Sequence, residues 1–314
     1  MVNIRKAAII GTGFVGSSSA FALMQKGLYN ELVLVDANKE KAQGEAMDIA
    51  HGLPYSNPMR IYAGEYEDLK DASLIVITAG AAQKPGETRL DLIKKNSAIM
   101  TSIVKELVKV KVEGILLIVA NPVDVLTHVA LKVSGFPANR VFGSGTVLDT
   151  ARLKYLLSEK LEIDTRNVHA VVMGEHGDSE FPAWSFANIS GMPLADFAEL
   201  KGYQDFEGLK NEIHKEVRDS AYEIIAKKGA TYYGIALSVT RIAECIVKNE
   251  HSMLPVSVEL HGEYGLDGLA LSIPAIISAK GVEQILELPL SAKERRELRS
   301  SGDTLKEIIK GLDI

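Results

Sequence analysis

His176 is the side chain in this sequence that is best suited to acid–base chemistry. It stands in the segment Gly174-Glu-His-Gly-Asp178. An imidazole with an ordinary pKa of about 6.5 gives and takes a proton near neutral pH, as the interconversion of a hydroxyl and a carbonyl requires. A carboxylate must then fix its tautomer, and Asp149 or Asp178 could serve. On this motif alone, a turn histidine without a chemical role stays an alternative. Five other histidines are expected on helix surfaces or in loops: His51, His128, His214, His251 and His261.

Two arginines could bind a small anion. Arg152 follows Asp149 by three residues on a predicted helix, so the two face the same side, and its guanidinium could clamp a carboxylate. Arg89 follows a loop at 83–88 that contains a Pro-Gly pair, and this loop predicts a lid. Each arginine taken singly is more often a surface ion-pair residue, so their weight comes from the neighbouring motifs.

A glycine-rich turn, Gly11-Thr-Gly13-Phe-Val-Gly16, predicts a dinucleotide site. In such a turn Gly11 permits the tight bend, Gly13 lets the backbone approach a pyrophosphate, and Gly16 lets helix and strand pack closely. Asp36 ends the next predicted strand, about 20 residues after the last glycine, where a carboxylate could accept from a ribose 2′-hydroxyl. The same carboxylate would repel a 2′-phosphate, which favours NAD over NADP. A solvated acid at a strand end remains the alternative for Asp36.

Short apolar runs alternate with amphipathic segments over the first half of the chain, as in parallel β-α-β units. The expected strands are 6–10, 32–36, 74–78 and 115–120, the expected helices are 14–27, 39–51 and 87–109, and a further strand is expected at 168–173. Ligands of such sheets bind outside the carboxyl ends of the strands. There the sequence places Thr78-Ala-Gly80 and Asn121-Pro-Val-Asp124, and Asn121 is biased toward an extended backbone because a proline follows it.

The pattern predicts an α/β protein of two domains. Residues 1–144 are expected to form a Rossmann domain, a doubly wound parallel sheet that binds NAD, and residues 145–314 an α+β substrate domain. A capping box, Ser291-Ala-Lys-Glu294, predicts the start of a final helix.

Composition excludes several classes of partner. The 314 residues carry 35 Lys and Arg against 41 Asp and Glu, a net charge of −6, without the basic excess that nucleic acid requires. The apolar run 114–135 is broken by polar residues, so no membrane span is expected. A single cysteine, Cys245, cannot form an internal disulfide, and the chain shows no secretory signal, so a cytoplasmic protein is expected.

The chain resembles the bacterial L-lactate dehydrogenases of the lactate and malate dehydrogenase family. Six motifs stand in the family's order: Gly11-Thr-Gly-Phe-Val-Gly16, Thr78-Ala-Gly-Ala-Ala-Gln-Lys-Pro-Gly-Glu-Thr-Arg89, Asn121-Pro-Val-Asp124, Leu148-Asp-Thr-Ala-Arg152, Gly174-Glu-His-Gly-Asp-Ser179 and Lys228-Gly-Ala-Thr231. The resemblance implies reversible hydride transfer between NAD and pyruvate or L-lactate, at the end of fermentative glycolysis, with no metal.

The resemblance also implies residue roles. His176 would donate the proton to the carbonyl and Asp149 would orient it, while Arg152 would bind the carboxylate and Arg89 would polarise the carbonyl once the loop closes. The implied substrate-binding set is Gln83, Arg89, Asn121, Asp124, Arg152 and Thr231. The implied cofactor-binding set is Gly11, Gly13, Val15, Gly16, Asp36, Lys41, Tyr66, Gly80, Ala81, Ser102, Asn121 and Ser144.

Substrate choice should depend on Gln83, where the family's malate dehydrogenases carry an arginine for the second carboxylate of oxaloacetate. Neutral Gln83, with Thr231 at the same end of the pocket, suits pyruvate. A malate or other L-2-hydroxy acid dehydrogenase is the nearest alternative. A non-catalytic NAD-binding regulator is a further one, against which the full catalytic set argues.

The resemblance leaves regulation open. Many relatives are activated by fructose 1,6-bisphosphate through an arginine and a histidine at a subunit interface. Here His169 matches the histidine, but Lys154 replaces the arginine and lacks its bidentate fork. The resemblance further implies a homotetramer, or a dimer that tetramerises.

Overall fold

The computed structural model describes residues 2–82, 86 and 88–312. Among these residues, nine strands form one sheet in the order β14-β13-β12-β6-β5-β4-β1-β2-β3. Strands β1 to β6 pair in parallel, in the doubly wound order of a dinucleotide-binding sheet. The expected fold class is therefore confirmed. These six strands are β1 Asn3–Ile10, β2 Glu31–Val35, β3 Arg60–Ala63, β4 Ala72–Ile77, β5 Ile115–Ile118 and β6 Val141–Gly143.

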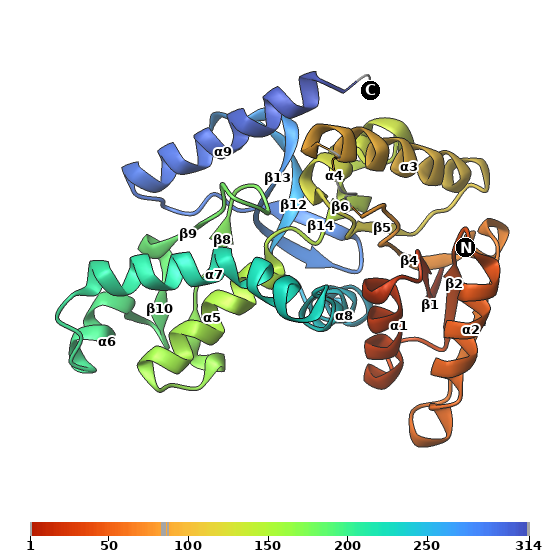
Figure 1. Ribbon diagram of the computed structural model, residues 1–314, viewed down its shortest axis with the longest axis horizontal. Helices are drawn as coiled ribbons and strands as arrows, with labels where there is room; N and C mark the ends of the chain where they lie inside the picture. The colour runs from red at the N-terminus through yellow and green to blue at the C-terminus, as the bar shows by residue number, and fades with distance from the viewer. Residues whose placement is uncertain (1, 83–85, 87, 313–314) are drawn as a thin grey trace.

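Alternate residues of the strands point to opposite faces, so helices cover the sheet on both sides (Figure 1). Ala7 and Ile9 of β1 pack in the core with α1 and α2, whereas Ala8 and Ile10 pack in the core with α3 and α4. The helices of this half are α1 Phe14–Lys26, α2 Lys39–Ala50, α3 Arg89–Lys109 and α4 Val123–Ser134. The near-continuous apolar runs of the sequence follow from this two-sided burial.

The second half extends the same sheet with antiparallel strands, and β12 pairs with β6. One continuous sheet therefore contains strands from both sides of the expected domain boundary at residues 144 and 145. The long strands are β12 Ser252–His261, β13 Asp267–Ser278 and β14 Gly281–Ile285; the short ones are β7 Val168–His169, β8 Val172–Met173, β9 Phe181–Pro182, β10 Asn188–Ile189 and β11 Met192–Pro193. The helices are α5 Val147–Leu161, α6 Leu194–Leu200, α7 Phe206–Lys228, α8 Tyr233–Lys248 and α9 Ala292–Lys310. Short 3₁₀ turns lie at Leu53–Tyr55, Tyr66–Leu69, Ala138–Arg140, Thr165–Asn167, Trp184–Phe186 and Glu263–Gly265.

The structure corrects the bounds of one expected helix and one expected strand, and it confirms the expected start of the last helix. Helix α3 starts at Arg89 rather than at residue 87, because Thr88 caps it by accepting from the Asp91 amide. The expected strand 168–173 is split into β7 and β8, which belong to different sheets. The capping box at α9 is confirmed, since Ser291 and Glu294 each accept from the other's backbone amide.

His128 is buried, which corrects the expectation of a surface histidine. Helix α4 packs against the sheet and is buried on nearly every side, and only 5% of His128 is exposed. Within the described residues, no helix combines the length and the apolar character needed to cross a membrane.

Candidate active site

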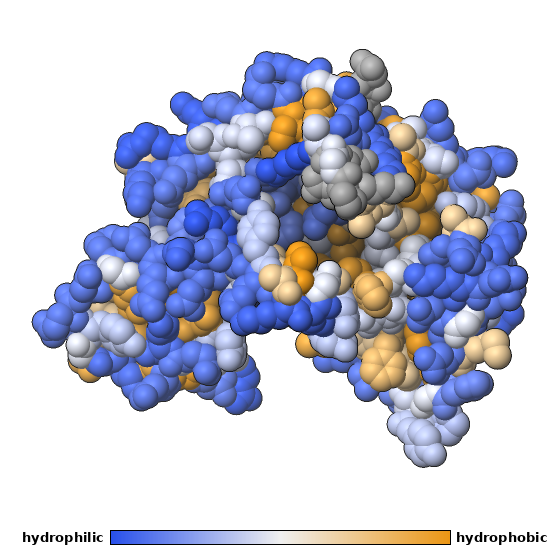
Figure 2. Space-filling view, in the orientation of Figure 1, coloured by the Kyte–Doolittle hydropathy of each residue, from blue (hydrophilic) through white to orange (hydrophobic). Residues whose placement is uncertain are grey.

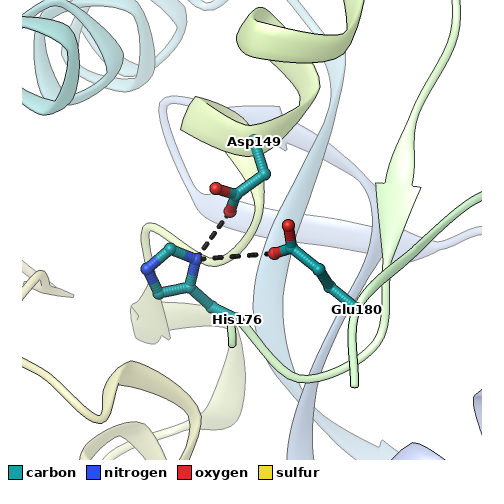
Figure 3. A group of neighbouring side chains, drawn as sticks. All are labelled: Asp149, His176 and Glu180. Atoms are coloured by element: carbon teal, nitrogen blue, oxygen red, sulfur yellow. Dashed lines mark hydrogen bonds and ion pairs between the residues drawn. The ribbon is translucent and has the colours of Figure 1, made fainter. Parts of the chain in front are cut away.

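The His176 imidazole lies in the loop between β8 and β9, against the first turn of α5. Its Nδ1 is 2.6 Å from Oδ2 of Asp149, which is 1% exposed (Figure 3). The other ring nitrogen, Nε2, points away from this carboxylate (Figure 3). Burial of the ring opposes its protonation, but the Asp149 charge and hydrogen bond outweigh burial and raise the pKa of His176 to about 9. The pair can hold a proton at neutral pH and present it on Nε2.

Asp149 also pairs with Arg152, the second functional side chain of α5. Its Oδ1 accepts from Arg152 at 2.5 Å, one helical turn further on. Burial alone would raise the pKa of Asp149, yet the charges of His176 and Arg152 hold it below its ordinary value. Asp149 therefore stays ionised between two cations. Only 13% of the Arg152 side chain is exposed, so its charge lies in a largely water-excluded site.

Asp178 does not orient His176. Its Oδ1 accepts from the Tyr222 hydroxyl at 2.8 Å, and its Oδ2 lies 3.5 Å from Arg89. Of the two carboxylates that the sequence offered as partners of His176, Asp149 is the one that contacts the imidazole.

The backbone of the His176 loop is fixed by three other elements. Asp124, in the first turn of α4, accepts from the His176 amide at 2.8 Å and from the hydroxyl of Ser272, on β13, at 2.9 Å. Ser301 of α9 accepts from the Glu175 amide at 2.7 Å. Burial raises the pKa of Asp124 to about 6 against the hydrogen bonds that it accepts. Asp124, expected among the substrate-binding residues, thus lies behind the catalytic loop, with both oxygens engaged.

Arg89 lies at the start of α3, and 58% of its side chain is exposed. Its guanidinium contacts Glu175 at 3.1 Å and Asp178 at 3.5 Å, both in the His176 loop. Glu175 is buried, and its other oxygen accepts from Ser179 at 2.6 Å. No sequence pattern predicted a role for Glu175, although it stands next to His176. Arg89 thus reaches the rim of the site from the end of the expected lid.

Other expected substrate residues are less closely defined. Gln83 lies outside the described residues. Thr231 is half-buried in the link between α7 and α8, and Asn121 follows β5, where its backbone carbonyl accepts from Asn96 at 2.9 Å.

A cavity of about 680 Å³ opens at the carboxyl ends of β1 and β4, where the strand order reverses. Its walls contain eight residues of the expected cofactor set: Gly11, Gly13, Asp36, Lys41, Tyr66, Gly80, Ala81 and Ser102. The expected residues Val15, Gly16, Asn121 and Ser144 are not among those that line it.

The glycine turn at this cavity fits a pyrophosphate. A Cβ on Gly13 would meet nothing within 4 Å, so the backbone is open there, beside the first amides of α1. A Cβ on Gly16 would lie 1.8 Å from the Gly11 carbonyl, so only glycine lets α1 pack on β1. Asp36 accepts from the Thr12 amide at 2.6 Å and from Asn38 at 2.9 Å. Although burial opposes it, these bonds lower the pKa of Asp36, which remains an acceptor for ribose hydroxyls.

Glu180 is a buried carboxyl of the site that the sequence analysis missed. It ends the His176 loop, four residues beyond the histidine, and its Oε2 lies 3.9 Å from Nδ1 (Figure 3). No local spacing could have found it, because i and i+4 side chains meet on a helix whereas residues 175–180 form a loop.

Lys154 and His169 meet at a separate cavity of about 630 Å³, which Arg241 also lines. Burial lowers the pKa of Lys154.

A dinucleotide cavity at the switch point of a doubly wound sheet, with a histidine–aspartate pair and an arginine nearby, defines an NAD-dependent oxidoreductase. Residues 5–143 match the family model of the lactate/malate dehydrogenase NAD binding domain, and residues 146–313 match that of the lactate/malate dehydrogenase alpha/beta C-terminal domain. The chain belongs to the lactate/malate dehydrogenase family.

Curated relatives and solved structures agree with this membership. The L-lactate dehydrogenase of Acetivibrio thermocellus is 52% identical over 311 residues, 99% of this chain and 98% of the relative. That of Thermoanaerobacterium saccharolyticum is 53% identical over 98% of this chain and 99% of the relative. The crystal structure of a lactate dehydrogenase from a Medee basin deep-sea metagenome library superposes with a TM-score of 0.96 at 47% identity and covers 100% of both chains. The minor L-lactate dehydrogenase of Enterococcus mundtii, in its ligands-bound form, also gives 0.96, at 43% identity over 99% of each chain.

Proposed function

We propose that the protein is an L-lactate dehydrogenase that reversibly reduces pyruvate to L-lactate with NADH. The observation that carries the proposal is the ion-pair chain from Arg152 through Asp149 to His176, which holds a carboxylate-binding cation and a proton donor on the two oxygens of one buried carboxylate. The names of the relatives support the substrate. NAD supplies or accepts the hydride when bound. We further propose that residues 1–144 form the cofactor half and residues 145–314 the substrate half.

Each step falls to a named side chain. His176 donates its Nε2 proton to the oxygen of the substrate carbonyl, and Asp149 stabilises the imidazolium and its orientation. Arg152 pairs with the substrate carboxylate in its water-poor site. Arg89 leaves Glu175 when the loop before α3 closes, and then polarises the carbonyl. Asn121 donates to the same oxygen.

The pH dependence tests this assignment. Reduction needs the protonated imidazole, whose pKa is raised to about 9, so kcat/KM for pyruvate should be flat near neutrality and fall as the pH rises through about 9. Lactate oxidation needs the neutral imidazole, and its rate should rise over the same range.

The direct experiment for the proposed function follows NADH absorbance with pyruvate, oxaloacetate and 2-ketoisocaproate in parallel. No NADH consumption with any acid would favour the non-catalytic regulator, and faster consumption with oxaloacetate the malate dehydrogenase.

The Gln83→Arg variant should turn the enzyme toward oxaloacetate. A charge-assisted hydrogen bond contributes about 1.5–3 kcal/mol, so the ratio of kcat/KM for oxaloacetate to that for pyruvate should rise about 10- to 100-fold. Gln204→Arg, an exposed position between α6 and α7, is the matched control and should leave the ratio unchanged. An unaltered ratio in Gln83→Arg would remove Gln83 from the specificity site.

We also propose that the cavity of Lys154 and His169 binds fructose 1,6-bisphosphate and that occupancy activates the enzyme. Lysine meets a phosphate as a point charge, so activation should need more activator than with an arginine. Titration of the rate with the sugar phosphate should show activation that Lys154→Ala abolishes and Lys154→Arg strengthens. Lys160→Ala, on the same helix but outside the cavity, is the control. A flat response of the unmodified enzyme would refute this site.

The assembly that we propose is a homotetramer. Several large apolar side chains of α1, α2 and α8 are exposed in the single chain, as a subunit contact would require: Phe14, Phe21, Met47 and Leu237. One face of the molecule also shows scattered apolar patches between polar ones (Figure 2). Sedimentation equilibrium measures the assembly directly, and a monomer at micromolar concentration would contradict it.

A further inference from the structure

The active site contains a further buried carboxyl for which the proposed reaction has no use. Glu180 is 5% exposed. One oxygen from each of Asp149 and Glu180 and a ring nitrogen of His176 all lie within 4.8 Å of one another. Two ionised carboxylates so close together, away from water, repel each other strongly. A proton on one of them removes the repulsion and turns that carboxyl into a hydrogen-bond donor to the other.

The surroundings decide which carboxyl takes the proton. Asp149 has two cationic partners in direct contact, Arg152 at 2.5 Å and His176 at 2.6 Å. For Glu180 the structure gives a single ion-pair contact among the described residues, His176 at 3.9 Å. Burial and the charge of Asp149 raise the pKa of Glu180 to about 9 against the opposing charges of His176 and Arg152, and the hydrogen bond from Glu180 helps to keep the pKa of Asp149 low. Glu180 is therefore the neutral partner near pH 7.

The other groups that face Glu180 leave this assignment intact. From α7, His214 places Nε2 3.2 Å from the Glu180 backbone carbonyl, and burial lowers the pKa of this histidine, so it adds little charge near neutrality. From α4, Asp124 lies behind the His176 backbone. Arg89, at the start of α3, pairs with Glu175 and Asp178 on the outer side of the loop.

We propose that Glu180 is a positioning residue of the acid–base site: as a neutral carboxyl it donates to Asp149, and once ionised it helps to keep the proton on His176. The proposal rests on the proposed function. When the pH rises, loss of the Glu180 proton adds a negative charge near Nδ1, which favours the imidazolium just where it would otherwise lose its proton. His176 and Glu180 then titrate as a coupled pair, and the active range for reduction extends further into alkali.

Glu180→Gln tests this with little change in size, because the amide can still donate to Asp149 but cannot ionise. We expect kcat for pyruvate reduction at pH 7 to stay within a few-fold of that of the unmodified enzyme. The alkaline limb of the pH profile, where kcat/KM falls as the pH rises, should move to lower pH by about one unit or more. Glu180→Asp, which keeps the acid, should return the limb toward that of the unmodified enzyme. Glu259→Gln, at an ion pair with Lys132, is the matched control and should not move the limb. Superimposable profiles for Glu180→Gln and an active unmodified enzyme would overturn the proposal.

A second readout does not depend on catalysis. In the cofactor-free protein, the infrared difference between the unmodified chain and Glu180→Gln should contain the C=O stretch of a protonated carboxyl at pH 7. That band should vanish as the pH rises through about 9. Its absence at pH 7 would refute the neutral Glu180. If the unmodified enzyme reduced no pyruvate at any pH, the proposed function would fail, while the infrared band would still decide the state of Glu180.

Discussion

His176→Ala should lower kcat for pyruvate reduction by about 10²- to 10⁴-fold, the range expected when a positioned proton donor is lost. The imidazole is the donor because Asp149 holds Nδ1 and raises the pKa of the ring to about 9, which leaves Nε2 protonated at neutral pH. NADH binding should be retained, since His176 is not among the residues that line the dinucleotide cavity. Stopped-flow measurement of NADH oxidation gives the rate, and the fluorescence of bound NADH gives the affinity.

The matched control for this variant is His261→Ala, which removes an exposed histidine at the end of β12. It should leave both rate and affinity unchanged. Near-normal turnover of His176→Ala would move the proton donor elsewhere. A loss of NADH binding equal to the loss of rate would instead indicate a collapsed loop, because the His176 amide also donates to Asp124.

Arg152→Lys should weaken pyruvate binding, with KM rising about 10- to 100-fold, because the planar fork that makes two parallel bonds to a carboxylate is lost. Lysine retains a positive charge near Asp149, so the alkaline limb of the pH profile should keep its position. This combination of raised KM and an unmoved pH limb separates substrate binding from proton transfer. Steady-state kinetics from pH 6 to 10 would record both.

Arg166→Lys provides the control for Arg152→Lys. Arg166 is an exposed arginine paired with Asp164 at 2.7 Å, outside the site, and its replacement should change neither KM nor the profile. If Arg152→Lys left KM within two-fold of the original, the substrate carboxylate would have to bind another cation, and Arg89 would be the first to test.

Much of the fold was predictable from the sequence because its signals are local. Near-continuous apolar runs specify strands that are buried on both faces, and the spacing of Gly11, Gly13 and Gly16 specifies a turn in which a Cβ on Gly16 would collide with the Gly11 carbonyl. Among the parallel strands, β3 and β6 were missed because each is short: β3 is only partly buried, and β6 has three residues. Strand 168–173 was predicted as one element because its break follows from the pairing of its two halves with different partners, β7 with β10 and β8 with β9.

The chemical residue types and their order along the chain were determined by the sequence alone: a histidine in a glycine-flanked loop, an aspartate and an arginine one helical turn apart, and a carboxylate after the second strand. Tertiary structure decided which groups meet. Asp149 contacts Nδ1 of His176, whereas Asp178 contacts Tyr222 and Arg89. Glu180 lies beside the buried pair of His176 and Asp149. The physical reason is that a pKa and an ion pair depend on burial and on distances of a few ångströms between segments far apart in sequence, which no local pattern of residues encodes.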